Sequence, residues 1–197
     1  MAELLYMGHA SFRLTTKQGT VIYLDPYAGK GYDVPADYIL VTHEHYDHNA
    51  VSLPKRKDTT EIWRSSDMLI NGVYLTKMPA DVKVTAVPAC NRNHPIDKCV
   101  GYIIEADAKK LYFAGDTSYL PFMKEKLPSL HLDYAFLPCD GIFNMDAREA
   151  TRCAEAIKAL YSVPVHTKPG ELFDERIAKE FTPENRLIIH PGETIRV

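Results

Sequence analysis

Apolar residues occur along this chain mostly in short runs that are separated by polar and turn-forming residues. Short runs of this kind predict β-strands rather than long helices. Three runs near the start, at residues 4–7, 11–16 and 20–25, follow one another around a Gln-Gly turn and predict an antiparallel meander. The continuous apolar run at residues 38–42 predicts a buried strand.

The second half of the chain has the same pattern. A hairpin is predicted at residues 99–116, where two apolar stretches flank a polar turn at Asp107 to Lys109. Single strands are predicted at residues 81–89, 132–138, 186–190 and 193–197. A Pro-Gly pair separates the last two of these and breaks the pattern between them.

Helical periodicity is clear in one place, after Asp146. Asp146 and Glu149 have the spacing of a capping box. Apolar residues then recur on one face at helical period: Ala150, Cys153, Ala154, Ile157, Leu160 and Tyr161. A second helix is predicted over residues 174–181, and a third follows the loop at residues 43–48 or starts near Ser66. Frequent strands with intervening helices predict an α/β fold in which helices cover sheet layers.

Composition narrows the class of protein. A chain of 197 residues has room for one domain with a sizeable core, so we expect a single domain over residues 1–197. Its 46% hydrophobic and 25% charged residues are typical of a soluble globular protein. The net charge of −3 argues against a nucleic-acid partner, which usually requires a basic face.

The lack of a targeting signal and the pattern of the cysteines predict a cytoplasmic location. No apolar run approaches the roughly 20 residues that span a bilayer, and the start of the chain lacks the pattern of a signal peptide. The four cysteines form no CxxC pair, and we expect reduced, mostly buried thiols. A disulfide between Cys90 and Cys99 would require an oxidising compartment that nothing else in the sequence indicates.

The loop after the buried strand at residues 38–42 is rich in metal-binding side chains. It carries His43, His45, Asp47 and His48. In an extended backbone, His43 and His45 project to the same side, and the next two residues follow where the chain can turn. Imidazole and carboxylate groups suit zinc, manganese or iron. The alternative is a surface loop whose histidines bind nothing.

Other candidate ligands favour the metal site. His94, Asp116 and His166 each follow the end of a predicted strand, the last of them after a short strand at residues 163–165. In layered α/β folds, strand ends project side chains into one crevice. A lone histidine is more often an ordinary polar residue, and a lone Gly-Asp pair is more often a turn. Their recurrence at strand ends makes them a candidate set.

These motifs carry a resemblance to a known family. The HxHxDH pattern at residues 43–48, the Gly-Asp-Thr at 115–117, the GHASF segment at 8–12 and the MDAREA segment at 145–150 resemble those of metallo-β-lactamase-fold hydrolases. Within that superfamily the sequence is similar to the branch that includes the ascorbate-6-phosphate lactonases. The resemblance covers nearly the whole chain. It implies a four-layer αββα sandwich with a binuclear metal site at one edge.

The resemblance also implies roles for individual residues. One metal would be held by His43, His45 and His94, the other by Asp47, His48 and His166, with Asp116 between the two metals. Asp47 would also orient the attacking water or take its proton, which makes it the candidate catalytic residue. Zinc is the first expectation, and manganese or iron also fits this ligand set.

Other residues have supporting or alternative roles. Asp25 matches a motif aspartate that supports the loop, and His9 is expected near the site as a partner of the ligands or a substrate contact. Arg92 and Lys168 lie two residues from candidate ligands and could meet an anionic substrate, or they are solvated surface cations. Cys139 either lies close to the crevice or is a core thiol. Two histidines are expected to bind no metal: His131 and His190.

The leading functional prediction is a metal-dependent hydrolase in which a metal-activated water cleaves a small ester, lactone, amide or phosphodiester. No Gly-x-Ser-x-Gly motif offers a protein nucleophile. The alternatives are a ribonuclease of the same fold and a non-catalytic or diiron redox protein. A short segment between the histidine-rich loop and His94 predicts an open site for a small molecule. An exposed sheet edge or the C-terminal strand could pair with a second copy.

Overall fold

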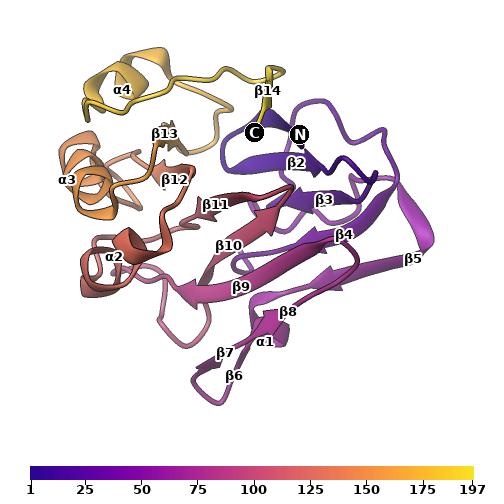
Figure 1. The fold of residues 1–197 in the computed structure, drawn as a ribbon. Helices are drawn as coiled ribbons and strands as arrows, with labels where there is room; N and C mark the ends of the chain where they lie inside the picture. Colours follow the sequence, from indigo (N-terminus) through magenta and orange to yellow (C-terminus); the bar gives the residue numbers. More distant parts are fainter.

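The computed structural model describes residues 1–197 and contains two six-stranded sheets that face each other (Figure 1). The first sheet has, in spatial order, β14 (Thr194–Arg196), β1 (Glu3–Gly8), β2 (Ser11–Thr15), β3 (Val21–Leu24), β4 (Ala36–Leu40) and β5 (Arg56–Trp63). The second has β13 (Tyr161–Val165), β12 (Tyr134–Pro138), β11 (Lys109–Phe113), β10 (Val100–Ala106), β9 (Val82–Pro88) and β8 (Thr76–Lys77). The two chain termini lie close together because β1 pairs with β14.

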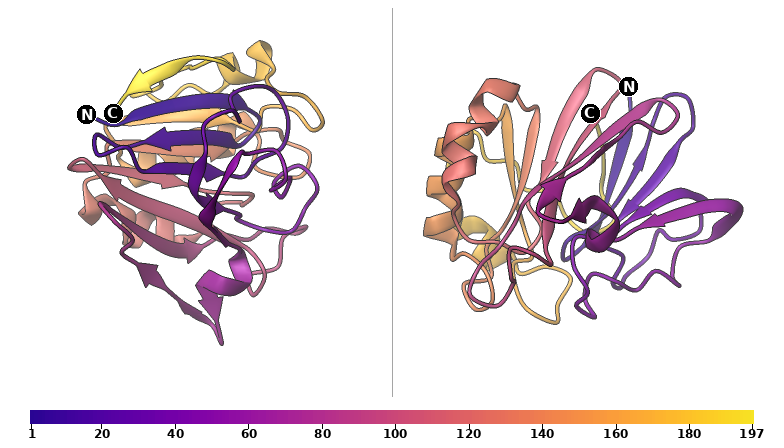
Figure 2. Two further views of the ribbon diagram at one scale, coloured as in Figure 1. Left: turned by 90° about the vertical axis from the view of Figure 1, so that its right-hand side faces the viewer. Right: turned by 90° about the horizontal axis from the view of Figure 1, so that it is seen from below.

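Short helices and one small hairpin complete the fold. The hairpin is formed by β6 (Leu69–Ile70) and β7 (Val73–Tyr74). The helices are α1 (Ser65–Met68), α2 (Pro121–Glu125), the 3-10 turn Leu127–Leu130, α3 (Ala147–Ile157) and α4 (Glu175–Glu180). Helices α2 and α3 cover the outer face of the second sheet (Figure 2). None of these helices has the length and apolarity that crossing a membrane requires.

The strands read as continuous apolar runs because many are buried on both faces. Alternate residues of β1 and β12, such as Tyr6 and Phe136, point into the core between the two sheets. On β12 the intervening Ala135 and Leu137 pack against the helices. On the first sheet the outer face, including Met7, is covered by residues of connecting loops rather than by long helices.

Most predicted elements are confirmed. The N-terminal meander, the 99–116 hairpin and the strands that precede the candidate ligands all form. Helix α3 begins after Asp146, whose side chain accepts a hydrogen bond from the Glu149 backbone N–H (2.7 Å). The predicted helices at residues 174–181 and near Ser66 correspond to α4 and α1.

Two predictions about elements are wrong. Residues 186–190 form no strand beyond an isolated bridge at Arg186; this run is apolar because Ile189 enters the core between the sheets. Leu160 and Tyr161 are not on the apolar face of α3, because the helix ends when Lys158 adopts a left-handed conformation (φ 58°). Strand β5 was not predicted, because its charged residues are typical of an exposed edge strand.

Candidate metal centre

The histidine-rich loop follows the C-terminal end of β4 in the first sheet and is anchored by Asp25. The Asp25 carboxylate accepts hydrogen bonds from the Thr42 backbone N–H and hydroxyl, both at 2.7 Å, and from Nδ1 of His48 at 2.8 Å. The His48 N–H closes a turn onto the His45 carbonyl (3.0 Å). Asp25 therefore supports the loop that carries the candidate ligands.

Asp116 lies at the centre of the cluster. Its carboxylate oxygens are 3.2 Å from Nε2 of His94, 3.3 Å from Nε2 of His48 and 3.5 Å from Nε2 of His166. Nε2 of His43 is 4.0 Å away. Asp116 is almost completely buried. The end of β11 thus delivers one carboxylate to four imidazoles that come from three other segments of the chain.

All seven side chains proposed as ligands from the sequence meet at this place. Three overlapping groups have ligand atoms within 4.8 Å of one another: His43, His45 and His94; His43, His48 and Asp116; and His9, Asp47, His48 and His166. The first group and the last correspond to the two sets that the resemblance implies, with His9 added to the last. The structure brings together every residue of the predicted set.

For most of these histidines, a contact to Nδ1, the ring nitrogen that faces away from the centre of the cluster, orients the ring. Nδ1 of His94 donates to Asn91 Oδ1 (2.8 Å), and Nδ1 of His166 lies 3.0 Å from Asp140 Oδ2. Nδ1 of His43 lies 3.0 Å from the Thr42 hydroxyl. A proton fixed on Nδ1 leaves the lone pair of Nε2 directed at the centre, as metal-binding histidines require. His45 is the exception, because its Nδ1 faces Nε2 of His94 at 3.1 Å.

Two of these orienting residues were missed by sequence reasoning. Asp140 follows β12 within the Cys-Asp-Gly stretch, and Asn91 follows β9 three residues before His94. Asp140 also accepts hydrogen bonds from the backbone N–H groups of Ile142 and Phe143, both at 2.7 Å. A strand-end position was the available signal for Asp140, since that same signal had identified the candidate ligands.

His9 lies against the cluster. Its ring is fully buried, with Nε2 3.2 Å from Asp47 Oδ2 and Nδ1 3.0 Å from the Glu171 carbonyl. His9 lies in the turn between β1 and β2, and its left-handed backbone (φ 58°) aims its ring into the site. Its contact with Asp47 supports a role as partner of a ligand.

The remaining predicted residues lie outside the cluster. Arg92 is exposed, and Lys168 forms an ion pair with Glu171. Cys139 is a buried thiol on the helix side of the second sheet and contacts the Val165 carbonyl (3.6 Å), which agrees with the core alternative. His131 is exposed, and His190 pairs with glutamates elsewhere on the surface. All four cysteines are free, as predicted.

Charged groups in the cluster shift one another's pKa values. Burial, reinforced by the charge on His48, lowers the pKa of His43 to about 2. Burial also opposes the charged form of His48, but Asp116 and Asp25 outweigh it and hold its pKa well above the usual value. For His166 the nearby carboxylates likewise overcome burial and raise the pKa to about 9. Neighbouring charged histidines keep the pKa of Asp116 well below normal despite its burial.

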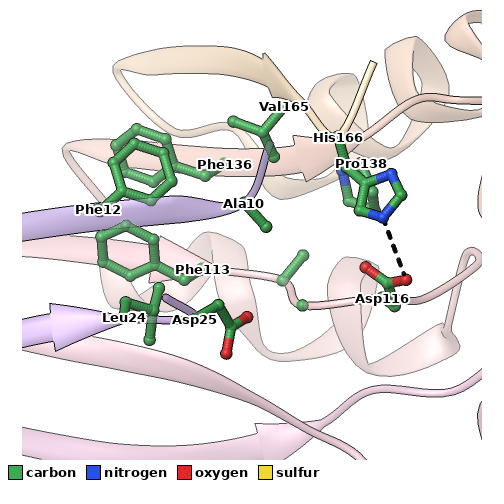
Figure 3. A pocket seen from close by; sticks show the side chains of 12 residues that line it. Ala10, Phe12, Leu24, Asp25, Phe113, Asp116, Phe136, Pro138, Val165 and His166 are labelled. Carbon is green, nitrogen blue, oxygen red and sulfur yellow. Dashed lines mark ion pairs between the residues drawn. The ribbon is translucent and has the colours of Figure 1, made fainter. Parts of the chain in front are cut away.

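Space around the cluster is divided between a small void beneath it and open hollows above it. The void is about 10 Å³, no larger than one water, and lies between Asp25, Asp116, His166 and the core ring of Phe136 (Figure 3). Above the cluster, a hollow of about 440 Å³ is lined by Asp47, His94 and Asp116, among others. A substrate can therefore reach these groups only from the open side.

Known proteins are similar to this chain in sequence and fold. Residues 3–166 match the β-lactamase superfamily domain. Metal-dependent hydrolases of the UPF0173 family from Thermococcus onnurineus and Thermus thermophilus are each 30% identical, and each alignment covers 100% of both chains. A crystal structure from Parabacteroides distasonis is 27% identical, covers 97% of this chain and 93% of the other, and has a TM-score of 0.78.

More distant structures agree in fold. Igni18, a metallo hydrolase from Ignicoccus hospitalis, is 22% identical with a TM-score of 0.77, and the match covers 98% of this chain and 97% of that one. An isothiocyanate hydrolase from gut bacteria of Delia radicum is 17% identical with a TM-score of 0.70 and 98% coverage of both chains. The predicted fold class and the superfamily resemblance are confirmed. The chain belongs to the β-lactamase superfamily.

Proposed function

We propose that the cluster holds two divalent cations, with zinc as the first expectation and manganese or iron also compatible. The observation that carries this proposal is a set of buried atoms with no hydrogen-bond partner, all facing the centre of the cluster: Nε2 of His43, His48 and His166, and Oδ1 of Asp116. Leaving such atoms unpaired costs about 1–3 kcal/mol each. Metal coordination would satisfy all of them.

The charge of the cluster supports the same number of cations. Four carboxylates lie in it, Asp25, Asp47, Asp116 and Asp140, and their charged-group contacts are all with histidines. Two divalent cations would balance four negative charges once the imidazoles are neutral. One set of ligands would be His43, His45 and His94, the other Asp47, His48 and His166, with Asp116 shared.

The chain is a metal-dependent hydrolase of the metallo-β-lactamase fold. Bound cations would lower the pKa of a water to about 7 and polarise the substrate oxygen. Asp47 and Asp116 are the two proposed carboxylate ligands that line the open hollow, and Asp47 is the more exposed of them, with 13% of its side chain exposed against 4% for Asp116. Asp47 Oδ2 lies 3.2 Å from His9 and 3.7 Å from His166, which fix the carboxylate. We assign Asp47 the role of orienting the attacking water and holding its proton.

The substrate we propose is a small molecule with an ester, lactone, amide or phosphodiester bond. The hollow of about 440 Å³ is within the usual range for small-molecule sites. The relatives from Thermococcus and Thermus are named metal-dependent hydrolases, which agrees with this class of reaction. Four free thiols favour a reducing compartment, so we place the protein in the cytoplasm.

Metal analysis combined with a substrate panel tests this function. The purified protein should carry about two metal ions per chain, hydrolyse at least one member of a lactone, thioester and phosphodiester panel, and lose activity with a chelator. Asp116→Ala should lose the second metal and turnover. Asp33→Ala removes an exposed carboxylate and is the matched control. A protein without bound metal, or an Asp116→Ala variant with full activity, would contradict the proposal.

A further inference from the structure

Two aromatic side chains flank the hollow above the candidate metal centre. Tyr46 and Phe143 both line it, and they are 70% and 49% exposed. They come from different parts of the fold, the histidine-rich loop and the loop between β12 and α3. The wall formed by the candidate ligands is polar, whereas the rings of Tyr46 and Phe143 are more exposed to solvent.

Phe143 is held in its place by hydrogen bonds to its backbone. Its N–H donates to Asp140 Oδ1 (2.7 Å), and its carbonyl accepts from the Nδ2 atoms of Asn91 (3.0 Å) and Asn93 (3.3 Å). Asp140 and Asn91 are the residues that orient His166 and His94. The same network therefore fixes the backbone of Phe143 relative to the candidate ligands.

Tyr46 is supported by a second ring. Its edge-to-face contact with Tyr27 has a centroid distance of 5.9 Å and an interplanar angle of 78°. Tyr27 in turn lies 5.0 Å from the ring of His9. Both rims of the hollow therefore present an aromatic surface before any substrate arrives, which lowers the entropic cost of binding an apolar group.

Cations are missing from the same hollow. No lysine or arginine lines it, although Glu44 does. The guanidinium of Arg64 is bound by Glu44 at 2.7 Å, and Lys168 is paired with Glu171. The neighbouring hollow, beyond His45, contains Lys98, but with Asp97 and Glu44 beside it. Apart from the two proposed metal ions, a phosphate group on the substrate would meet the Glu44 carboxylate and no lysine or arginine in the lining of the hollow.

We propose that the substrate carries a neutral aromatic or bulky apolar group beside the bond that is cleaved, and that Phe143 and Tyr46 are the specificity-determining residues that bind this group. The inference rests on the proposed function, since it names the substrate class of that site. It also replaces the anionic substrate that Arg92 and Lys168 indicated from the sequence. Aromatic pairs favour offset or edge-to-face contacts, and both exposed rings can offer such a contact to a ring on the substrate.

Three metal-binding probes that share one hydroxamate group test this selectivity: acetohydroxamate, phenylacetohydroxamate and phosphonoacetohydroxamate. Calorimetry with metal-loaded protein should show that the phenyl probe binds about tenfold more tightly than acetohydroxamate, a difference of about 1.4 kcal/mol. The phosphono probe should bind no more tightly than acetohydroxamate. Phe143→Ala and Tyr46→Ala should each reduce the phenyl preference and leave acetohydroxamate affinity unchanged.

Ile142→Ala is the matched control, because Ile142 is exposed on the same loop and does not line the hollow. It should retain the full phenyl preference. Tightest binding of the phosphono probe, equal binding of all three probes, or a preference that survives both ring substitutions would overturn this inference alone. A protein that takes up neither zinc nor manganese would overturn the proposed function and the inference together.

Discussion

At the scale of single residues, the geometry of the candidate centre depends on what holds the outer nitrogen of each histidine. For His166 this group is a carboxylate, since Asp140 Oδ2 lies 3.0 Å from its Nδ1 and His166 is almost fully buried. A carboxylate there fixes the proton on Nδ1 and leaves Nε2 free to bind a metal. Asp140 then sets the orientation of the His166 ring without being one of the proposed metal ligands.

Asp140→Asn tests this orienting role. The amide oxygen can still accept from the loop backbone, but its NH2 group would face Nδ1 and favour the His166 tautomer with the proton on Nε2. We expect the affinity for the second metal to fall about 10–100-fold. Asp133→Asn, which alters a carboxylate paired with Lys109 away from the site, is the control. Equal zinc affinities of the two variants in competition titrations would argue against the role.

The candidate ligands could be identified from the sequence, but their partners could not. HxHxDH is a local pattern, and Asp116 and His166 follow apolar strand runs that are visible in one dimension. Asp140 and Asn91 act through contacts set by the packing of separate loops, and an Asp or Asn after a strand is also an ordinary turn residue. Their roles become visible only when the loops are placed in three dimensions.

At the scale of elements, the site depends on how closely two strand ends approach. Gly115 follows β11 with a left-handed backbone (φ +63°), and a Cβ there would lie 2.9 Å from the Val100 carbonyl oxygen and 3.1 Å from Thr42 Cβ. Thr42 belongs to the loop that Asp25 braces. Glycine at this position therefore allows the ends of β4 and β11 to deliver their side chains to one point.

Gly115→Ala should distort the meeting point of these strands. Gly72→Ala is the matched control, because Gly72 also has a positive φ (+78°) but no atom within 4 Å of the added Cβ. The control isolates the backbone strain of about 1–2 kcal/mol. We expect Gly115→Ala to lose about 1–3 kcal/mol more in the free energy of unfolding, measured with urea on metal-free protein. Equal losses in both variants would contradict the close approach.

The strands differ in how well they can be predicted from the sequence. Strands buried on both faces, such as β10 and β12, are continuous apolar runs and were predicted. The edge strand β5 is largely exposed and polar, so its alternation gives no hydrophobic signal. Residues 186–190 show the reverse error, because Ile189 is apolar for core packing while the backbone forms only one bridge. An apolar run shows that its residues are buried. It does not show that their backbone pairs with a neighbouring strand.

At the scale of the molecule, the fold gathers four carboxylates at the strand ends of its two sheets: Asp25, Asp47, Asp116 and Asp140. In metal-free protein these groups are balanced in part by protonated His48 and His166. Metal ligands must be deprotonated, so cations have to displace those protons. The same charge cluster that attracts divalent cations therefore makes their binding dependent on pH.

The direction of this dependence follows from His166, whose pKa is raised to about 9 in the metal-free protein. At pH 7 its ring is mainly protonated, so zinc uptake should release protons and the zinc affinity should rise as the pH increases toward 9. Calorimetry at pH 7 in two buffers of different ionisation enthalpy measures the protons released. Identical heats in both buffers would show that the ligands are already deprotonated.

The most direct test of the whole account is an anomalous difference map from crystals grown with zinc and measured at the zinc absorption edge. The account predicts two peaks, both in contact with Asp116, one beside the first set of histidines and one beside the second set of ligands: His43, His45 and His94, and Asp47, His48 and His166. Fewer than two peaks at this cluster, or zinc bound only elsewhere on the chain, would contradict it.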